Sequence, residues 1–77
     1  MTGELAVDFD AETQSLTALN AAAYRIAGVA TCQIDKERTR YLCRLAPIES
    51  VRPEALRTQF LQLVTDENVR ESLRAKT

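Results

Sequence analysis

The sequence predicts a small α+β domain whose elements follow the order strand, helix, strand, strand, helix. Three short segments alternate apolar and polar residues with a period of two, which is typical of half-buried strands. Two longer segments repeat their apolar residues at helical spacing. The chain has 77 residues, enough for one domain with a modest core. We therefore expect a single α+β domain over residues 1–77.

The first two expected elements are a strand over residues 5–9 and a helix over residues 15–28. The strand alternates large apolar residues with smaller or polar ones: Leu5, Val7 and Phe9 with Ala6, Asp8 and Asp10. Ser15 is the expected N-cap, because its hydroxyl can accept a hydrogen bond from an N–H of the first turn. Gly28 marks the expected helix end, since glycine readily adopts the left-handed conformation that closes many helices.

Two further strands, expected over residues 30–35 and 40–45, predict a hairpin. Their inward apolar residues recur at every second position and are Ala30, Cys32, Ile34, Tyr41, Cys43 and Leu45. The loop over residues 36–39 is short and polar, as expected between paired strands. It lacks the Asn-Gly pair of a tight turn, so the sequence leaves the register open.

The last expected helix begins at Pro53, where the missing N–H of proline does no harm. Its apolar stripe consists of Leu56, Phe60, Leu63 and Val64. Val69 lies about 140° around the helix from Val64, at about 100° per residue, and Leu73 follows Val69. Two interpretations are open. Either the helix bends near residues 65–68, or it carries a second apolar face that contacts something other than the sheet.

These elements combine into one three-stranded sheet. A strand–helix–strand crossover is right-handed and places its two strands parallel. With the hairpin added, the simplest strand order is 1-3-2, a ferredoxin-like half that lacks its final strand. Both helices then cover one face. The opposite face is mostly polar and carries Ala6, Asp8, Thr31, Gln33, Arg40, Leu42 and Arg44.

The first strand lies at an edge of this sheet, on the side where a fourth strand would have paired. An open edge is either protected or accepts another strand, and strand addition is a common mode of peptide recognition. The sequence therefore predicts partner contacts at this edge and on the adjoining outer face, with the candidates Ala6, Val7, Asp8 and Leu42. The alternative is that outward acids such as Asp8 and Asp10 only keep the edge soluble.

The composition excludes several classes of function. A net charge of −1 argues against nucleic-acid binding, which relies on clustered Lys and Arg. The chain has no His and two Cys, too few ligands for a zinc site and no base for a histidine-activated nucleophile. We expect no catalytic residue, metal or cofactor. There is no apolar run of about 20 residues for a membrane span and no signal peptide, so we expect a cytosolic protein.

The two cysteines fall on the inward face of the expected hairpin. A short and symmetric loop would place Cys32 opposite Cys43, and a disulfide between them is one interpretation. The other is a pair of reduced thiols that serve as small core residues, as is usual in the cytosol.

Three parts of the chain resemble the HxsD family of the His-Xaa-Ser systems: the acidic-hydrophobic N-terminal strand that leads into the first helix, the short strand pair that follows, and residues 60–77. Residues 22–25 read AAYR, where the family typically has an AAYRF-like run. Residues 60–77 are similar to the ending of the family, and the residues in step are Phe60, Asp66, Arg70, Glu71 and Thr77. The chain departs from the pattern at Ile26, which replaces an aromatic residue, and at Val69, which replaces a leucine.

The resemblance implies an accessory role in radical SAM peptide maturation. The partners would be the precursor peptide, the radical SAM maturases or both, and the iron–sulfur and SAM chemistry would belong to those enzymes. It adds Tyr24, Arg25, Arg70 and Glu71 as candidate contact residues, although these also fit an exposed tyrosine and ordinary charged helix faces. Two other functions stay open. One is a homodimeric structural module formed edge to edge or through the last helix, and the other is a small regulatory, antitoxin-like domain.

Overall fold

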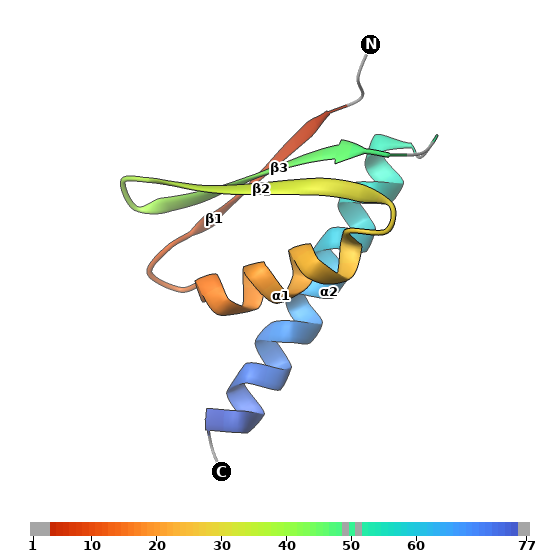
Figure 1. Ribbon diagram of the computed structural model, residues 1–77. Coiled ribbons are helices and arrows are strands. Elements are labelled where there is room, and N and C mark those ends of the chain that lie inside the picture. The colour runs from red at the N-terminus through yellow and green to blue at the C-terminus, as the bar shows by residue number, and fades with distance from the viewer. Residues whose placement is uncertain (1–3, 49, 51, 76–77) are drawn as a thin grey trace.

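The computed structural model describes residues 4–48, 50 and 52–75. Its elements are β1 (Leu5–Asp10), α1 (Leu16–Ile26), β2 (Ala30–Glu37), β3 (Arg40–Pro47) and α2 (Pro53–Ala75). The strands form one antiparallel sheet in the order β1-β3-β2, so β1 and β2 run in the same direction. Both helices lie on one face of this sheet (Figure 1). The α+β class, the strand order and the helix placement expected from the sequence are confirmed.

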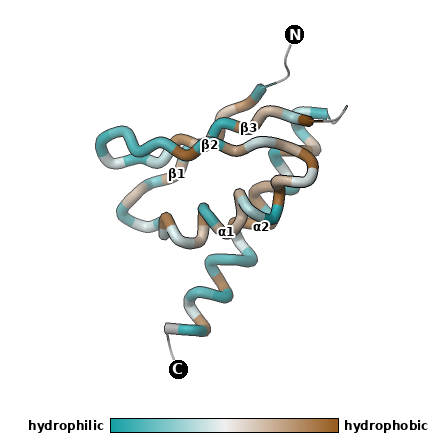
Figure 2. Tube along the Cα trace, viewed as in Figure 1, coloured by the Kyte–Doolittle hydropathy of each residue, from teal (hydrophilic) through white to brown (hydrophobic). Residues whose placement is uncertain are grey.

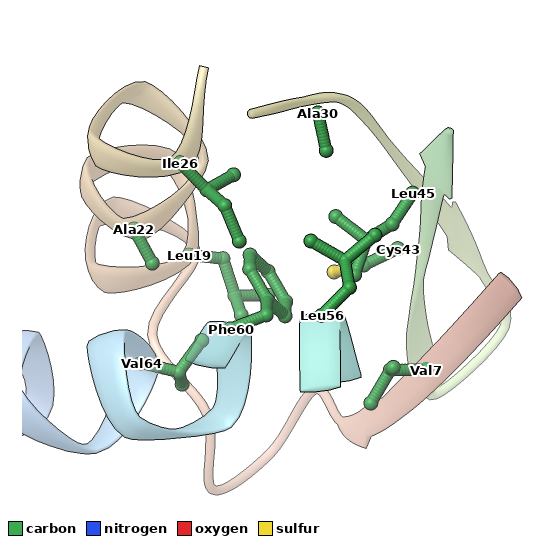
Figure 3. Packing of buried hydrophobic residues seen from close by; sticks show 10 residues of the cluster. All are labelled: Val7, Leu19, Ala22, Ile26, Ala30, Cys43, Leu45, Leu56, Phe60 and Val64. Carbon is green, nitrogen blue, oxygen red and sulfur yellow. The ribbon is translucent and has the colours of Figure 1, made fainter. Parts of the chain in front are cut away.

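The core lies between the sheet and the two helices, where side chains from all five elements meet (Figure 3). The buried cluster consists of Val7, Leu19, Ala22, Ile26, Ala30, Cys43, Leu45, Leu56, Phe60 and Val64. Phe60 is the largest of these fully buried side chains. Its ring meets that of Phe9 edge to face, with 6.4 Å between centroids and an interplanar angle of 62°. This contact joins α2 to β1.

α1 begins and ends close to the expected positions, but its C-terminal cap differs from the expected one. The Oγ of Ser15 accepts a hydrogen bond from the amide of Ala18 at 3.3 Å, which confirms Ser15 as the N-cap. The helix ends at Ile26, and Ala27 caps it in a right-handed conformation. Gly28 does not take the left-handed conformation, and a Cβ added to it would meet nothing within 4 Å. The expected position was right within two residues, whereas the expected glycine cap was wrong.

The hairpin is longer and tighter than the sequence indicated. Lys36 and Glu37 continue β2 and pair with Tyr41 and Arg40 of β3, so the expected loop over residues 36–39 shrinks to two residues. Tight two-residue hairpin turns need positive φ angles, usually at Gly or Asn. Here Arg38 takes that role with φ 57°. The hairpin end is hydrophilic and points away from both helices (Figure 2).

α2 is one continuous helix that runs through residues 65–68. Its core-facing stripe continues from Val64 to Glu67, which is 6% exposed. Val69 and Leu73 leave this stripe and are 54% and 61% exposed. α2 therefore carries apolar residues away from the core, as the second interpretation expects, and a partner for them stays a prediction. The C-terminal end of the helix projects beyond α1 (Figure 1).

Candidate functional site

The open side of β1 offers unpaired peptide groups at defined positions. Just beyond the strand, the amide of Ala11 donates to the carbonyl of Thr39 at 2.7 Å. Since hydrogen-bonded and non-bonded pairs alternate in an antiparallel ladder, the odd-numbered residues of β1 bond to β3. The N–H and C=O groups of Ala6 and Asp8 therefore point toward the open edge, where no strand pairs within the described ranges 4–48, 50 and 52–75.

β2 forms the second open edge of the sheet within the described residues. The amide of Ile48 donates to the carbonyl of Val29 at 2.9 Å, so the odd-numbered residues of β2 bond to β3. The even-numbered residues, from Ala30 to Lys36, direct their peptide groups outward. α1 packs alongside β2, whereas α2 contacts β1. The two edges therefore differ in the helix that lies next to them.

A hollow on the outer face of the sheet adjoins the β1 edge. It has a volume of about 380 Å³ and is lined by Asp8, Glu37, Arg38, Thr39, Arg40 and Leu42. Asp8 lies directly opposite Leu42 in the ladder, so the structure brings these two candidate residues together. The Nε of Arg40 donates to the Oδ2 of Asp8 at 2.8 Å, and both side chains are about half exposed. Such exposed pairs contribute little to stability, so a ligand can replace this contact.

The two remaining candidates on β1, Ala6 and Val7, have side chains on opposite faces of the sheet. Ala6 is exposed on the outer face, next to the free peptide groups. Val7 is 6% exposed and belongs to the core, and its peptide groups face β3. Val7 therefore holds the strand in place, and its side chain is not available to a partner.

The candidate residues from the helices form a separate group on the other side of the sheet. The Nη1 of Arg25 donates to the Oδ2 of Asp66 at 2.6 Å and to the Oε2 of Glu67 at 2.9 Å. The Nε of Arg70 also contacts the Asp66 carboxylate, at 3.0 Å. Tyr24, by contrast, is 86% exposed. Arg25 thus joins α1 to α2, and Arg70 supports that contact.

The N-terminus of α1 is also tied to α2 through polar side chains. The Oγ of Ser15 donates to the Oε2 of Glu71 at 2.8 Å. The side-chain amides of Gln14 and Asn68 donate to each other, at 2.8 and 3.1 Å. Glu71, a candidate contact residue, is therefore already engaged within the chain.

These ion pairs shift the pKa values of Asp66 and Arg25. The hydrogen bond from Arg25, with further help from the charge of Arg70, lowers the pKa of Asp66 below its usual range. The hydrogen bonds to Asp66 and then to Glu67 raise the pKa of Arg25. Both groups are consequently charged at neutral pH, and the contact between the helices weakens only in acid.

The sequence interpretation missed Glu67, Gln14 and Asn68. The signal for Glu67 was present, because it continues the helical spacing of Phe60 and Val64 beyond the last apolar residue. A carboxylate at a core position requires a cation partner, and Arg25 on the preceding helix supplies it. Nothing in the sequence pattern indicated the Gln14–Asn68 pair, because these residues meet only where the two helices cross.

The cysteines are diagonal neighbours rather than opposite each other. Cys32 pairs with Leu45, whereas Cys43 pairs with Ile34, because the turn is centred one residue later than symmetry about the cysteines requires. Both are free thiols. The hydrogen bond with Cys32, together with burial, raises the pKa of the Cys43 thiol. Cys43 is therefore a protonated core residue.

The described part of the chain contains neither a metal-binding cluster nor a membrane-crossing helix. No group of three or more His, Cys, Asp or Glu side chains is placed to hold a metal ion within it. Neither helix there combines the length and the apolar composition that crossing a membrane requires.

Comparison with known protein families gives one match. The model of the family described as His-Xaa-Ser system protein HxsD matches residues 9–77. The chain belongs to the HxsD family. The match begins inside β1 and covers the hairpin and both helices, and it associates this HxsD protein with the His-Xaa-Ser system. No curated protein and no solved structure matches the sequence significantly.

The fold explains why the family-like stretches of this HxsD protein occur together. Arg25 of the AAYR run contacts Asp66 in the C-terminal stretch, and Asp66 in turn contacts Arg70. Arg25, Asp66 and Arg70 are far apart in the sequence, but in the fold they form one charged contact between α1 and α2. Tyr24 takes no part in the core, so it is the member of the run that is most available to a partner.

Proposed function

We propose that this HxsD protein is a non-catalytic, cytosolic accessory protein that holds the precursor peptide of a His-Xaa-Ser system and presents it to radical SAM maturases. The observation that carries the proposal is the open edge of β1, where the peptide groups of Ala6 and Asp8 have no strand partner among the residues that the structure describes. The iron–sulfur and SAM chemistry belongs to the maturases in this scheme, and the HxsD protein contributes binding alone.

In the proposed complex, an extended segment of the precursor adds to the sheet as a fourth strand beside β1. Its backbone exchanges hydrogen bonds with Ala6 and Asp8, which are about 7 Å apart along the strand. Alternate side chains of the segment lie on the outer face beside the hollow that contains Asp8 and Leu42. The others point toward the helix side, near Leu5 and Phe9, which are partly buried against the core.

Strand addition supplies affinity through backbone hydrogen bonds and specificity through the alternate side chains. The outer positions would favour basic residues, because Asp8 and Asp10 are both exposed there. The helix side of the molecule would remain free for a maturase. The exposed ring of Tyr24 is the contact that we propose on that side.

The test is an NMR titration of the labelled HxsD protein with synthetic peptides that span the His-Xaa-Ser repeat protein of the same system. Binding should shift the amide signals of Ala6 and Asp8 more than those of β2. Ala6→Pro removes one outward N–H and leaves the bonds to β3 intact, since proline is tolerated at such edge positions. It should weaken binding at least tenfold.

Lys36→Pro is the matched control, because it removes one outward N–H from the β2 edge instead. It should bind the peptides like the unchanged protein. Equal weakening by both variants, or by Lys36→Pro alone, would contradict the assignment to β1. A lack of affinity for both the peptides and the purified maturases would refute the accessory role itself.

A further inference from the structure

The face of α2 that points away from the core carries no charged residue from position 55 to position 73. We call this face the outer stripe; it consists of Ala55, Thr58, Leu61, Gln62, Thr65, Val69, Ser72 and Leu73. Leu61 lies at its margin and is partly buried against the core. At about 100° per residue, these positions cover about 120° of the helix surface. The charged residues of the same span lie outside the stripe, and they are Arg57, Asp66, Glu67, Arg70 and Glu71.

The lack of charge on this outer face is unusual. A helix on the surface of a domain normally turns its charged residues toward water and its apolar residues toward the core. In this chain 27% of all residues are charged, yet the most solvated face of the longest helix has none. Val69 and Leu73 are more than half exposed on it. The core does not require this face, so its composition points to a partner surface.

The spacing within the outer stripe fits a second helix. Ala55, Thr58, Gln62, Thr65, Val69 and Ser72 follow one another at intervals of three, four, three, four and three residues. This is the heptad spacing of a seam between two helices. Leu61 and Leu73 flank the seam, and a shallow hollow of about 330 Å³ lies over Thr58, Leu61, Gln62 and Thr65. The hollow gives room for a side chain from the opposite helix.

We propose that the occupant is a second copy of this chain, with the two α2 helices packed antiparallel about a two-fold axis at the middle of the seam, between Gln62 and Thr65. A two-fold interface places one surface against itself, and an uncharged stripe meets its own copy without repulsion. The antiparallel arrangement brings helix ends of opposite dipole together. A net charge of −1 per chain adds little long-range repulsion. This proposal does not depend on peptide binding at β1, and either can fail alone.

The size of the stripe sets the expected strength of the dimer. The seam from Ala55 to Ser72 spans 18 residues and is therefore about 27 Å long. A contact of that length buries on the order of 1,000 Å² in total, which is near the lower limit for a specific interface. We therefore expect a concentration-dependent dimer. A chain this short gains from such pairing, because its own core is small.

Sedimentation equilibrium over a wide range of protein concentration tests the proposal. The unchanged chain should form a dimer, and Val69→Glu should raise its dissociation constant at least tenfold, since the added charge occurs twice in the interface. The control is Asn20→Glu, which places the same charge on the exposed side of α1 and should leave dimerisation unchanged. Circular dichroism establishes that both variants keep their helices.

Cysteine cross-linking distinguishes the antiparallel arrangement from a parallel one. In a Cys32→Ser background, Thr65→Cys lies near the two-fold axis and should cross-link to its own copy under mild oxidation. Ser72→Cys lies opposite Ala55 of the other copy and should cross-link to an Ala55→Cys chain rather than to itself. Efficient self-cross-linking of Ser72→Cys would overturn the antiparallel arrangement.

A monomer at every concentration would overturn the second copy as the occupant. So would a dimer that Val69→Glu leaves intact. If the monomer instead binds a purified maturase through the stripe, and Val69→Glu abolishes that binding, the stripe belongs to a different partner and the dimer proposal is wrong.

Discussion

The edge-to-face contact between Phe9 and Phe60 is the most direct test of how β1 sits on the helices. The two rings come from residues 51 positions apart, with centroids 6.4 Å from each other. Truncating a buried phenylalanine to alanine costs about 3–5 kcal/mol. A chain of 77 residues has a total stability of only about 4–12 kcal/mol. Alanine variants would therefore risk unfolding the protein, and leucine is the better replacement.

The expected magnitudes follow from the packing. Phe60 is fully buried, so Phe60→Leu should lower the free energy of unfolding by about 1–2 kcal/mol. Phe9 is partly buried, and Phe9→Leu should cost less. Aromatic pairs contribute about 0.5–1.5 kcal/mol beyond area burial. The double variant should therefore lose less stability than the sum of the two single losses, by that amount.

Urea unfolding of the unchanged protein, the two single variants and the double variant measures the coupling energy between the two rings. A control cycle pairs Phe60→Leu with Thr31→Ala on the outer face of the sheet, and it should be additive within about 0.5 kcal/mol. If the Phe9–Phe60 coupling were no larger than the control, the two rings would not be in contact. β1 would then not lie over α2, and the position of its open edge would be wrong.

Three further predictions concern the ends and contacts of the helices. Ser15→Ala should lower the free energy of unfolding by about 1 kcal/mol in urea titrations, since it removes an N-cap together with the hydrogen bond to Glu71; an unchanged midpoint would contradict the cap. Gly28→Ala should be neutral or stabilising by about 0.4–1 kcal/mol in thermal unfolding, because the residue is not left-handed and has open space around it; a clear loss would show a strained backbone. The lowered pKa of Asp66 stabilises the fold above the unfolded pKa of about 3.9, and this contribution is lost as the pH falls through the folded pKa. Asp66→Asn should therefore flatten the acid limb of a stability–pH profile, and an identical limb in both proteins would exclude the ion pair.

The sequence was sufficient for the elements whose pattern is periodic. The alternation of Leu5, Val7 and Phe9 located β1, and the expected N-cap at Ser15 located the start of α1. The strand order followed from connection rules rather than from any single residue. These predictions succeeded because burial on one face imposes a regular spacing.

The features that the sequence did not predict depend on geometry between elements. Arg38 adopts a positive φ angle although nothing in its residue type favours one, so the turn was placed one residue too early. That shift also decided whether Cys32 faces Cys43 or lies diagonal to it. Likewise, Arg25 and Glu71 looked like surface charges, because only the crossing of α1 and α2 reveals their partners. The candidate site at β1 was predictable because it depends only on strand order.

The separation between β1 and its partner along the chain has a consequence for folding. The hairpin partners are adjacent in sequence, so β2 and β3 can associate within microseconds. β1 must instead close a loop, since its register joins residues 30 to 40 positions apart, from Asp10–Arg40 to Leu5–Leu45. Closing that loop costs chain entropy that the hairpin does not lose. β1 is therefore the strand expected to dock last and detach first, and the amides of Val7 and Phe9 should exchange with deuterium before those in the centre of the hairpin.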